Sequence, residues 1–185
     1  MKRLILAAAC LVFLLFPISA IAGPNDPADT TAAPDAVVYD AESALEFFKS
    51  LAGDWDGSSA ENQHGSYPAV SFRVMAAGSA VVETVWQGQP NEMESIFHMD
   101  GDNLLLTHYC ALENAPVLRF EPTDEPGLVK FVFHGGTNFD PAVDAHFHEG
   151  TFRIRDANTI ETTFVVHAGG EAQPEGSSVL TRRAN

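Results

Sequence analysis

Cysteine is almost absent from this sequence: only Cys10 and Cys110 occur among its 185 residues. We expect Cys10 to be removed with the N-terminal segment, which would leave the mature chain a single cysteine. One cysteine cannot form a disulfide within the chain, and this excludes a small disulfide-stapled scaffold. The stability must therefore come from a hydrophobic core, which a chain of this length and composition can bury in one domain.

Basic side chains are also scarce. Ten Lys and Arg residues stand against 25 Asp and Glu residues, and the formal net charge is −15. Without Lys2 and Arg3, the mature chain would carry about −17. A field of this sign repels phosphate backbones and anionic lipid headgroups. The charge thus argues against nucleic-acid binding and peripheral membrane binding, and it suits a neutral, apolar or cationic ligand.

Long apolar runs are absent outside residues 4–18. That run follows two basic residues and precedes Ala20-Ile21-Ala22, an A-x-A cleavage motif, so residues 1–22 are typical of a secretory signal peptide. We therefore expect a chain exported to the periplasm or the extracellular medium. No later segment approaches the roughly 20 apolar residues that a bilayer requires, so we expect no stable membrane insertion after signal cleavage.

A lipoprotein and an uncleaved anchor are the alternatives for this N-terminal segment. A lipidated cysteine should follow the apolar run, whereas most of the run follows Cys10. Pro17 interrupts the run, which is also short for a spanning helix. Both observations favour cleavage.

The remaining chain divides into a leader and one folded domain. Residues 23–38 are rich in Pro, Ala and Asp and predict a flexible leader, and residues 39–185 predict a single domain. The domain begins with a short helix, for which Asp40 is the expected N-cap and Gly53 the stop signal. One face of this helix carries apolar residues, namely Leu45, Phe48 and Leu51.

Beyond the helix, short alternating segments are separated by turn-forming residues. They predict strands at residues 54–60, 67–76, 80–87, 91–99, 103–111, 116–121, 126–134, 145–155, 159–167 and 177–183. About ten consecutive strands with hairpin-length connections predict an all-β fold, an antiparallel up-and-down barrel with one short N-terminal helix. A β-sandwich is the alternative architecture.

The segment from Leu51 to Gly57, which contains Gly53 and Trp55, resembles the G-x-W motif of the calycin superfamily, the lipocalins, fatty-acid-binding proteins and their bacterial relatives. The segments at residues 97–101 and 107–110 are similar to segments of uncharacterised exported bacterial lipocalin-like proteins. The resemblance implies a barrel with an interior cavity, closed where the tryptophan packs against an arginine of the last strand. Here either Arg182 or Arg183 can fill that role, through a cation–π contact.

Alternate residues of a barrel strand point inward, so the apolar half of each strand identifies its inner face. We predict that the aromatic and sulfur-containing members of these half-sets line a ligand cavity, with two histidines as polar contacts. The predicted cavity residues are Phe72, Phe97, Met99, Phe131, Phe133, His146, His148 and Phe164.

His146 and His148 are the most unusual members of this set. The apolar parity of the predicted strand 145–155 places both imidazoles on the inner face, about 6 to 7 Å apart. They could contact a ligand, or bind a metal ion together with His108 or Glu83. Alternatively, they lie at a barrel rim and hydrogen-bond to neighbours and water.

For the predicted strands that carry Glu83 and His108, the sequence does not determine which face points into the barrel. In residues 80–87, the half-set that contains Glu83 is as apolar as the other half-set, and the same holds for His108 in residues 103–111. A buried Glu83 would cost several kcal/mol unless its pKa rose, and a neighbouring histidine would relieve that cost.

Motifs of common enzymes are missing: the chain has no G-x-S-x-G elbow, Walker loop, H-E-x-x-H helix or C-x-x-C pair. We therefore expect a barrel that binds a small, mostly apolar molecule, with no cofactor required. The alternative is a barrel whose histidines hold haem or a divalent metal and support enzymatic chemistry. A third possibility is a barrel filled by its own side chains that acts through its surface.

Overall fold

A computed structural model describes residues 34–58 and 67–184. The predicted signal peptide and most of the predicted leader lie outside the described residues. No helix of the described part is long and apolar enough to cross a membrane. The elements are η1 (Pro34–Ala36), α1 (Ala41–Ser50), β1 (Gly53–Ser58), β2 (Tyr67–Met75), η2 (Ala76–Gly78), β3 (Ala80–Val85), β4 (Met93–Asp100), β5 (Asn103–Tyr109), β6 (Ala115–Glu121), β7 (Leu128–Thr137), β8 (His146–Asp156), β9 (Thr159–Ala168), β10 (Glu171–Ala172) and β11 (Gly176–Arg182).

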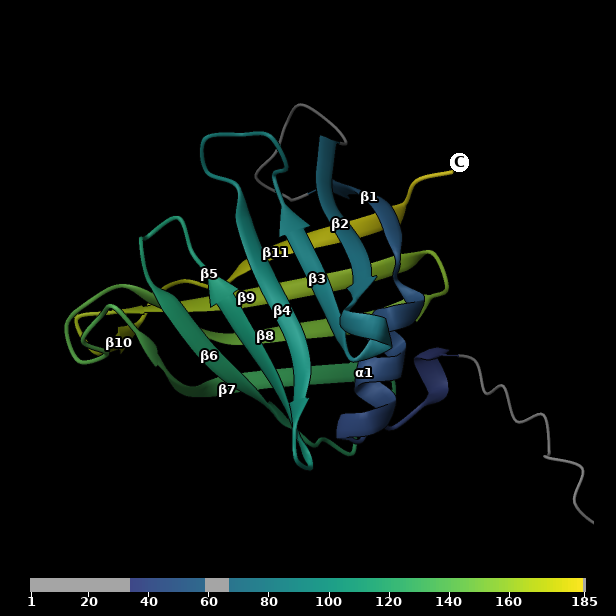
Figure 1. Cartoon of the computed structure of the whole chain (residues 1–185), viewed down its shortest axis with the longest axis horizontal. Coiled ribbons are helices and arrows are strands. Elements are labelled where there is room, and N and C mark those ends of the chain that lie inside the picture. The colour runs from purple at the N-terminus through teal and green to yellow at the C-terminus, as the bar shows by residue number, and fades with distance from the viewer. Residues whose placement is uncertain (1–33, 59–66, 185) are drawn as a thin grey trace, which may run out of the picture. The chain divides into compact units, whose positions relative to one another are not determined.

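The strands form a closed antiparallel barrel (Figure 1). Each strand from β1 to β9 pairs with the next along the chain, and β11 pairs with both β9 and β1, which completes a ring of ten strands. The predicted barrel is therefore confirmed and the sandwich is not formed. The sequence did not predict β10, a two-residue strand paired with the end of β9, because two residues are too few to show alternation.

The predicted helix is present as α1, and its ends follow the local signals. The Asp40 side chain accepts a hydrogen bond of 2.8 Å from the Ser43 backbone N–H, and the Ser43 hydroxyl accepts one of 3.0 Å from the Asp40 N–H. This capping box satisfies two backbone donors that no helical carbonyl can reach. Gly53 has φ +125°, which only glycine adopts readily, and it turns the chain from the helix into β1.

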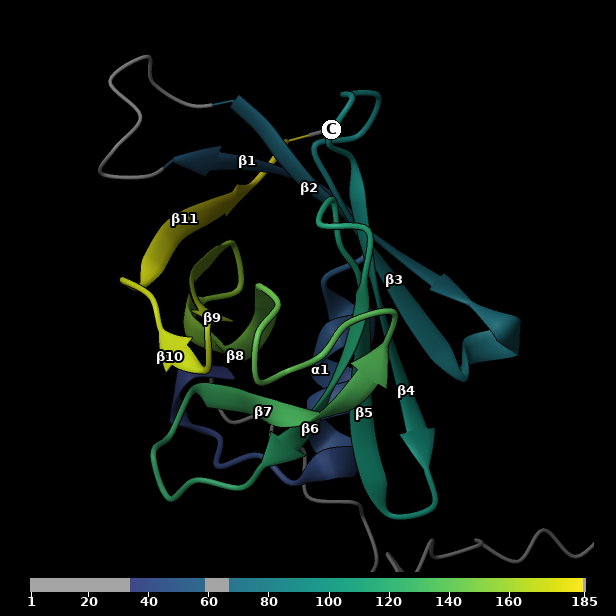
Figure 2. The same ribbon diagram turned by 90° about the vertical axis from the view of Figure 1, so that its left-hand side faces the viewer.

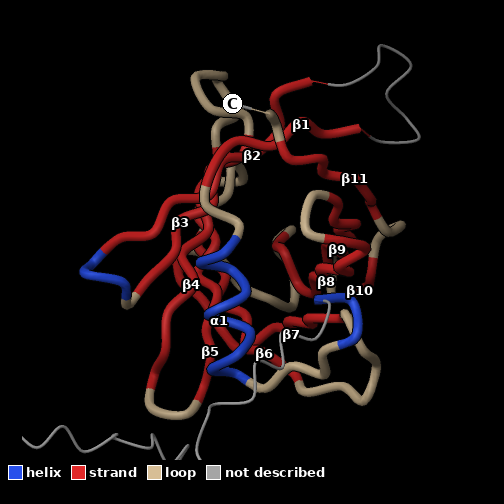
Figure 3. Tube along the Cα trace, turned by 90° about the vertical axis from the view of Figure 1, so that its right-hand side faces the viewer, coloured by secondary structure: helices blue, strands red, loops and turns tan. Residues whose placement is uncertain are grey.

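α1 lies across one end of the barrel, the end at which β1 begins, hereafter the helix end (Figure 3). Its Phe48 ring stacks on Phe97 of β4, with ring centroids 3.9 Å apart, and meets Phe152 of β8 edge-on at 4.9 Å. These partners come from strands on different sides of the ring, so Phe48 fills the barrel axis. The half of the barrel interior next to α1 is thus a packed core.

Trp55 and Arg182 seal the helix end, as the calycin resemblance implied. They are register partners on β1 and β11, and the guanidinium lies 4.4 Å from the centroid of the buried indole. Arg182 also donates hydrogen bonds of 3.0 Å to the carbonyls of Ser50 and Ala52, which ties the last strand to the end of α1. Arg183 instead points outward and pairs with Asp56.

The opposite end of the barrel, hereafter the far end, is where β3 ends and β8 begins (Figure 2). Bulges in β7 and β8 lie near this end. In β7 the extra residue is His134, between the paired Phe133 and Gly135, and in β8 it is His148, between the paired Phe147 and Glu149. A bulge inserts one unpaired residue and shifts the inward alternation beyond it.

Candidate ligand site in the far half of the barrel

In the half of the barrel next to the far end, hereafter the far half, some inward-facing side chains remain exposed to solvent. On β9, Ile160 pairs with Leu180, and both are buried in the core. Phe164 lies in the same inward row, paired with Gly150 and Gly176, yet it is 45% exposed. An inward-facing aromatic ring that stays exposed means that other side chains do not fill the space beside it.

Gly176 makes room for this ring. A Cβ atom at Gly176 would clash with Cζ of Phe164, so the ring covers the glycine on the inner face of the sheet. On the neighbouring strand, the Phe147 ring covers Gly150 in the same manner, at 2.7 Å. Glycines at these positions allow two aromatic rings to lie flat along the inner wall.

A row of polar side chains runs across three adjacent strands, from Glu83, the register partner of the core residue Phe72, to His108, which contacts Phe147 of the far half. Glu83 of β3 is the register partner of Ser95 of β4, which is in turn the partner of His108 of β5. All three are buried. Ser95 Oγ and His108 Nδ1 are 2.9 Å apart. The Ser95 side chain also acts on the Glu83 carboxyl group, whose pKa it lowers. Glu83 and His108 therefore both face into the barrel, which the sequence alone did not determine.

Burial favours the neutral form of both titratable groups in this row. It raises the pKa of Glu83 to about 7, against which the hydrogen bond from Ser95 acts only weakly. It lowers the pKa of His108 to about 4. Near neutral pH, His108 is therefore uncharged and Glu83 is close to the midpoint of its titration.

The order of the three groups decides what they can do. In a serine-nucleophile triad, the imidazole lies between the hydroxyl and the carboxylate. Here the Ser95 hydroxyl lies between the imidazole of His108 and the carboxyl group of Glu83. Because the Ser95 hydroxyl has one proton, it can donate to an ionised Glu83 only while it accepts from His108 Nδ1–H. The row suits the recognition of a polar ligand group that exchanges hydrogen bonds or charge with Glu83.

Three histidines gather separately where β8 begins and β9 ends. His146 Nδ1 lies 2.9 Å from the Asp144 carbonyl, so it must carry the proton and donate. In a neutral His146, Nε2 then accepts from His148 Nδ1–H at 3.0 Å. His148 stacks on His167, with ring centroids 3.5 Å apart and planes at 9°. Burial, and then the charges of His167 and His146, lower the pKa of His148.

Phenylalanines enclose this histidine cluster. Phe133 of β7 stacks on His148 at 4.9 Å, and Phe139 lies 4.8 Å from His146, between ring centroids. His146 is fully buried.

The predicted geometry of His146 and His148 is wrong in one respect. The bulge in β8 breaks the assumed alternation, and the two rings hydrogen-bond directly to each other, in line with the alternative that gave them neighbouring side chains as partners. His108 belongs to the other group of polar residues, next to Glu83. The three-ligand metal site that the sequence left open as an alternative is not formed: within residues 34–58 and 67–184 no group of three or more His, Cys, Asp or Glu side chains could hold a metal ion.

The predicted cavity residues divide between the two halves. Phe72, Phe97 and Phe131 are buried in the packed core, and Met99 packs against it. Phe133 belongs to the histidine cluster, and Phe164 is the predicted residue with the largest exposed area on the inner wall. Their role in binding stays a prediction.

Sequence reasoning missed Ser95 and Phe147. Ser95 interrupts the apolar half-set of its strand, which includes Met93 and Phe97, and a polar residue in such a set was the available signal. Phe147 meets His108 edge-on at 5.3 Å, but it faces inward only because of the bulge at His148. No local sequence pattern marks that bulge.

No family model matches the chain, and no curated protein matches it. Among solved structures, the chain is similar to the crystal structure of Rv2717c from M. tuberculosis, with a TM-score of 0.50 and 17% sequence identity over 76% of this chain and 98% of that chain. At this identity the similarity supports the barrel fold alone.

Proposed function

We propose that this protein binds a small, mostly apolar molecule in the far half of its barrel. The observation that carries the proposal is the exposed, inward-facing ring of Phe164. Apolar surface that is left accessible inside a closed barrel gains free energy when an apolar ligand covers it, about 25 cal/mol per Å². The buried row of Glu83, Ser95 and His108 would orient a polar group of that ligand.

Two further proposals concern ancestry and location. We propose a calycin relationship, supported by the G-x-W motif with Arg182 over Trp55. We propose export, supported by the signal-peptide pattern of residues 1–22. Neither depends on the identity of the ligand.

Native mass spectrometry of the mature chain, purified from its own secretory compartment, tests the binding proposal. A discrete extra mass in the native spectrum that vanishes on denaturation is expected. Independently, the neutral dye Nile red should fluoresce with the purified protein. The Phe164→Asp variant should lose this signal, whereas Tyr109→Asp, at an exposed outward position on β5, should keep it. Equal dye binding by both variants would contradict the proposed site.

The histidine cluster supports a second candidate, a haem-binding barrel with enzymatic activity. The described residues do not fit a three-ligand metal site, but haem can be held by a single histidine. This candidate predicts a haem absorption band in protein from its native source. The band should disappear in a His146→Ala, His148→Ala double variant and persist in His98→Ala. A spectrum without such a band would reject it.

A further inference from the structure

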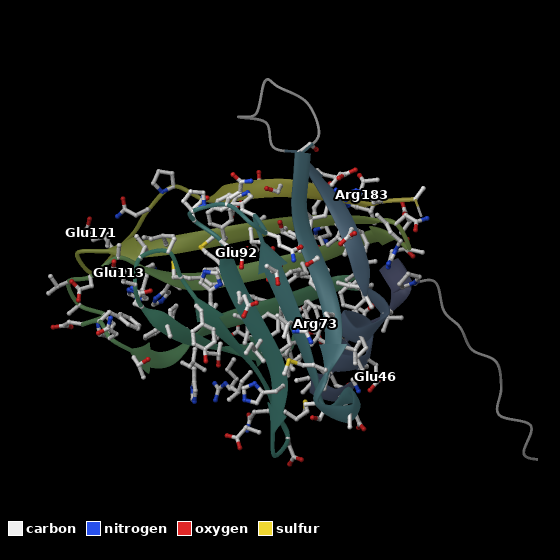
Figure 4. All side chains as sticks on the ribbon, turned by 45° about the horizontal axis from the view of Figure 1, so that its top comes forward. Glu46, Arg73, Glu92, Glu113, Glu171 and Arg183 are labelled. Carbon is white, nitrogen blue, oxygen red and sulfur yellow. The ribbon has the colours of Figure 1, made fainter. Side chains whose placement is uncertain are left out.

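Every lysine and arginine beyond Lys2 and Arg3 falls within the described residues. Lys130, Arg153 and Arg155 form ion pairs with glutamates of the outer surface. Arg73 and Arg119 are exposed and alternate with inward-facing neighbours, so they also point outward. The outward position of charged side chains is visible in Figure 4, which labels Glu46, Arg73, Glu92, Glu113, Glu171 and Arg183.

The three remaining basic residues also lie away from the far half. Lys49 on α1 pairs with Glu46, and Arg183 pairs with Asp56. Arg182 is held at the helix end by Trp55. The inner wall of the far half therefore has no cationic side chain of its own.

Glu83 is the one acidic side chain among the buried residues of the described chain. Its register partners are Phe72 on β2 and Ser95 on β4, and His108 follows Ser95 in the row. None of these neighbours offers a positive charge near neutral pH, because His108 is buried and uncharged. A carboxylate in this position lacks a counterion, and burial without one is costly.

We propose that the ligand is an apolar amine whose ammonium group pairs with the Glu83 carboxylate. This inference rests on the proposed binding function and specifies the ligand class. The apolar part of the amine covers the exposed inner wall around Phe164, and the ammonium group supplies the charge that the barrel lacks. Fatty-acid carboxylates are rejected, because they would place a second negative charge beside Glu83 with no basic side chain to offset it.

Binding of an ammonium group beside Glu83 should be coupled to proton release. With the pKa of Glu83 near 7, part of the free protein carries the neutral acid at neutral pH. An ammonium ligand favours the ionised form, so binding releases the Glu83 proton to solvent while the ligand keeps its own. Amine affinity should therefore rise as the pH increases from 5.5 to 8. Among the described residues, the other titratable group of the row is His108, which stays neutral over this range.

Displacement of Nile red from the mature chain by three probes of equal chain length tests the inference. At pH 8, octylamine should displace the dye at a concentration at least tenfold lower than octanol or octanoate. Glu83→Gln should remove this preference, so that octylamine and octanol displace the dye at similar concentrations. Glu94→Gln, an exposed acidic position on β4, is the matched control and should retain the preference.

The outcomes separate the two proposals. If all three probes displace the dye equally, or if the preference survives in Glu83→Gln, the amine inference is overturned while the binding function stands. If the dye does not bind and no probe binds, both are overturned. Should Glu83→Gln fail to fold, calorimetry of octylamine binding to the unaltered protein at about pH 6, below the pKa of Glu83, in buffers of different ionisation enthalpy still decides. Proton release is expected, and its absence would overturn the inference.

Discussion

At the residue scale, burial acts in opposite directions on the pH dependence of Glu83 and His108. The raised pKa of Glu83 means that the folded state binds more protons than the unfolded chain between about pH 4.5 and 7, so its contribution to stability is lost as the pH rises through this range. The lowered pKa of His108 means that its contribution is lost as the pH falls from about 6.5 to 4. In the intact row the two effects offset each other.

Replacing Glu83 by Gln should therefore expose the His108 effect alone. We expect the free energy of unfolding of Glu83→Gln to fall by up to about 3 kcal/mol between pH 7 and pH 4.5, relative to the unaltered protein over the same range. Urea denaturation at half-unit pH intervals measures this difference. If the free energies of unfolding of the two proteins changed with pH in parallel, Glu83 would not titrate in the range that its burial predicts.

Arg182 and Arg183 are adjacent residues with very different contacts. Arg182→Ala loses the contact with Trp55 and the hydrogen bonds to two carbonyls, so we expect a loss of about 2 to 3 kcal/mol in the free energy of unfolding. Arg183→Ala loses an exposed ion pair with Asp56, typically worth less than about 1 kcal/mol. Thermal unfolding of both variants makes the comparison, and equal losses would remove the closure role from Arg182.

Individual residues differ in how far the sequence determines their role. The position of Trp55 and of a terminal arginine was predictable, because the motif lies at a fixed place between the helix and the first strand. The inward position of Glu83 was not, since its strand is apolar on both faces. Its inward position depends on the pairing with Ser95 on the next strand, which the residues of one strand do not show.

At the scale of elements, α1 combines a local start signal with a distant packing role. Asp40→Ala should cost about 1 kcal/mol, because it removes one capping interaction. Phe48→Ala should cost about 3 to 5 kcal/mol, because the ring fills the barrel axis against Phe97 and Phe152. Urea denaturation curves measure both losses. A smaller loss for Phe48→Ala than for Asp40→Ala would mean that the helix only covers the barrel without filling it.

The same contrast explains which elements the sequence predicted well. The ends of α1 depend on residues three or four positions apart, so Asp40 and Gly53 were sufficient to place them. The bulge at His148 depends on how β8 meets both β7 and β9, which alternation within one strand cannot reveal. The error in the predicted histidine geometry follows from that single unpaired residue.

At the scale of the whole barrel, strand number and antiparallel order were predictable from segment lengths and turns. The division into a packed half and an accessible half was not, because it arises when α1 inserts Phe48 between strands that are distant in sequence. Aromatic residues with the same inward parity, such as Phe131 and Phe164, consequently have different surroundings. Parity identifies the inner wall, but it does not distinguish a core residue from an exposed one.

This division predicts opposite phenotypes for two similar substitutions. Phe131→Ser removes a fully buried ring that contacts Phe48, so it should lower the free energy of unfolding by at least about 3 kcal/mol. Phe164→Ser removes a ring that is already 45% exposed, so it should cost less than about 1 kcal/mol yet abolish Nile red binding. Stability and dye binding should therefore be separable in the same barrel. If Phe164→Ser destabilised the protein as much as Phe131→Ser, the far half would be packed core, and a ligand would have no accessible inner wall to cover.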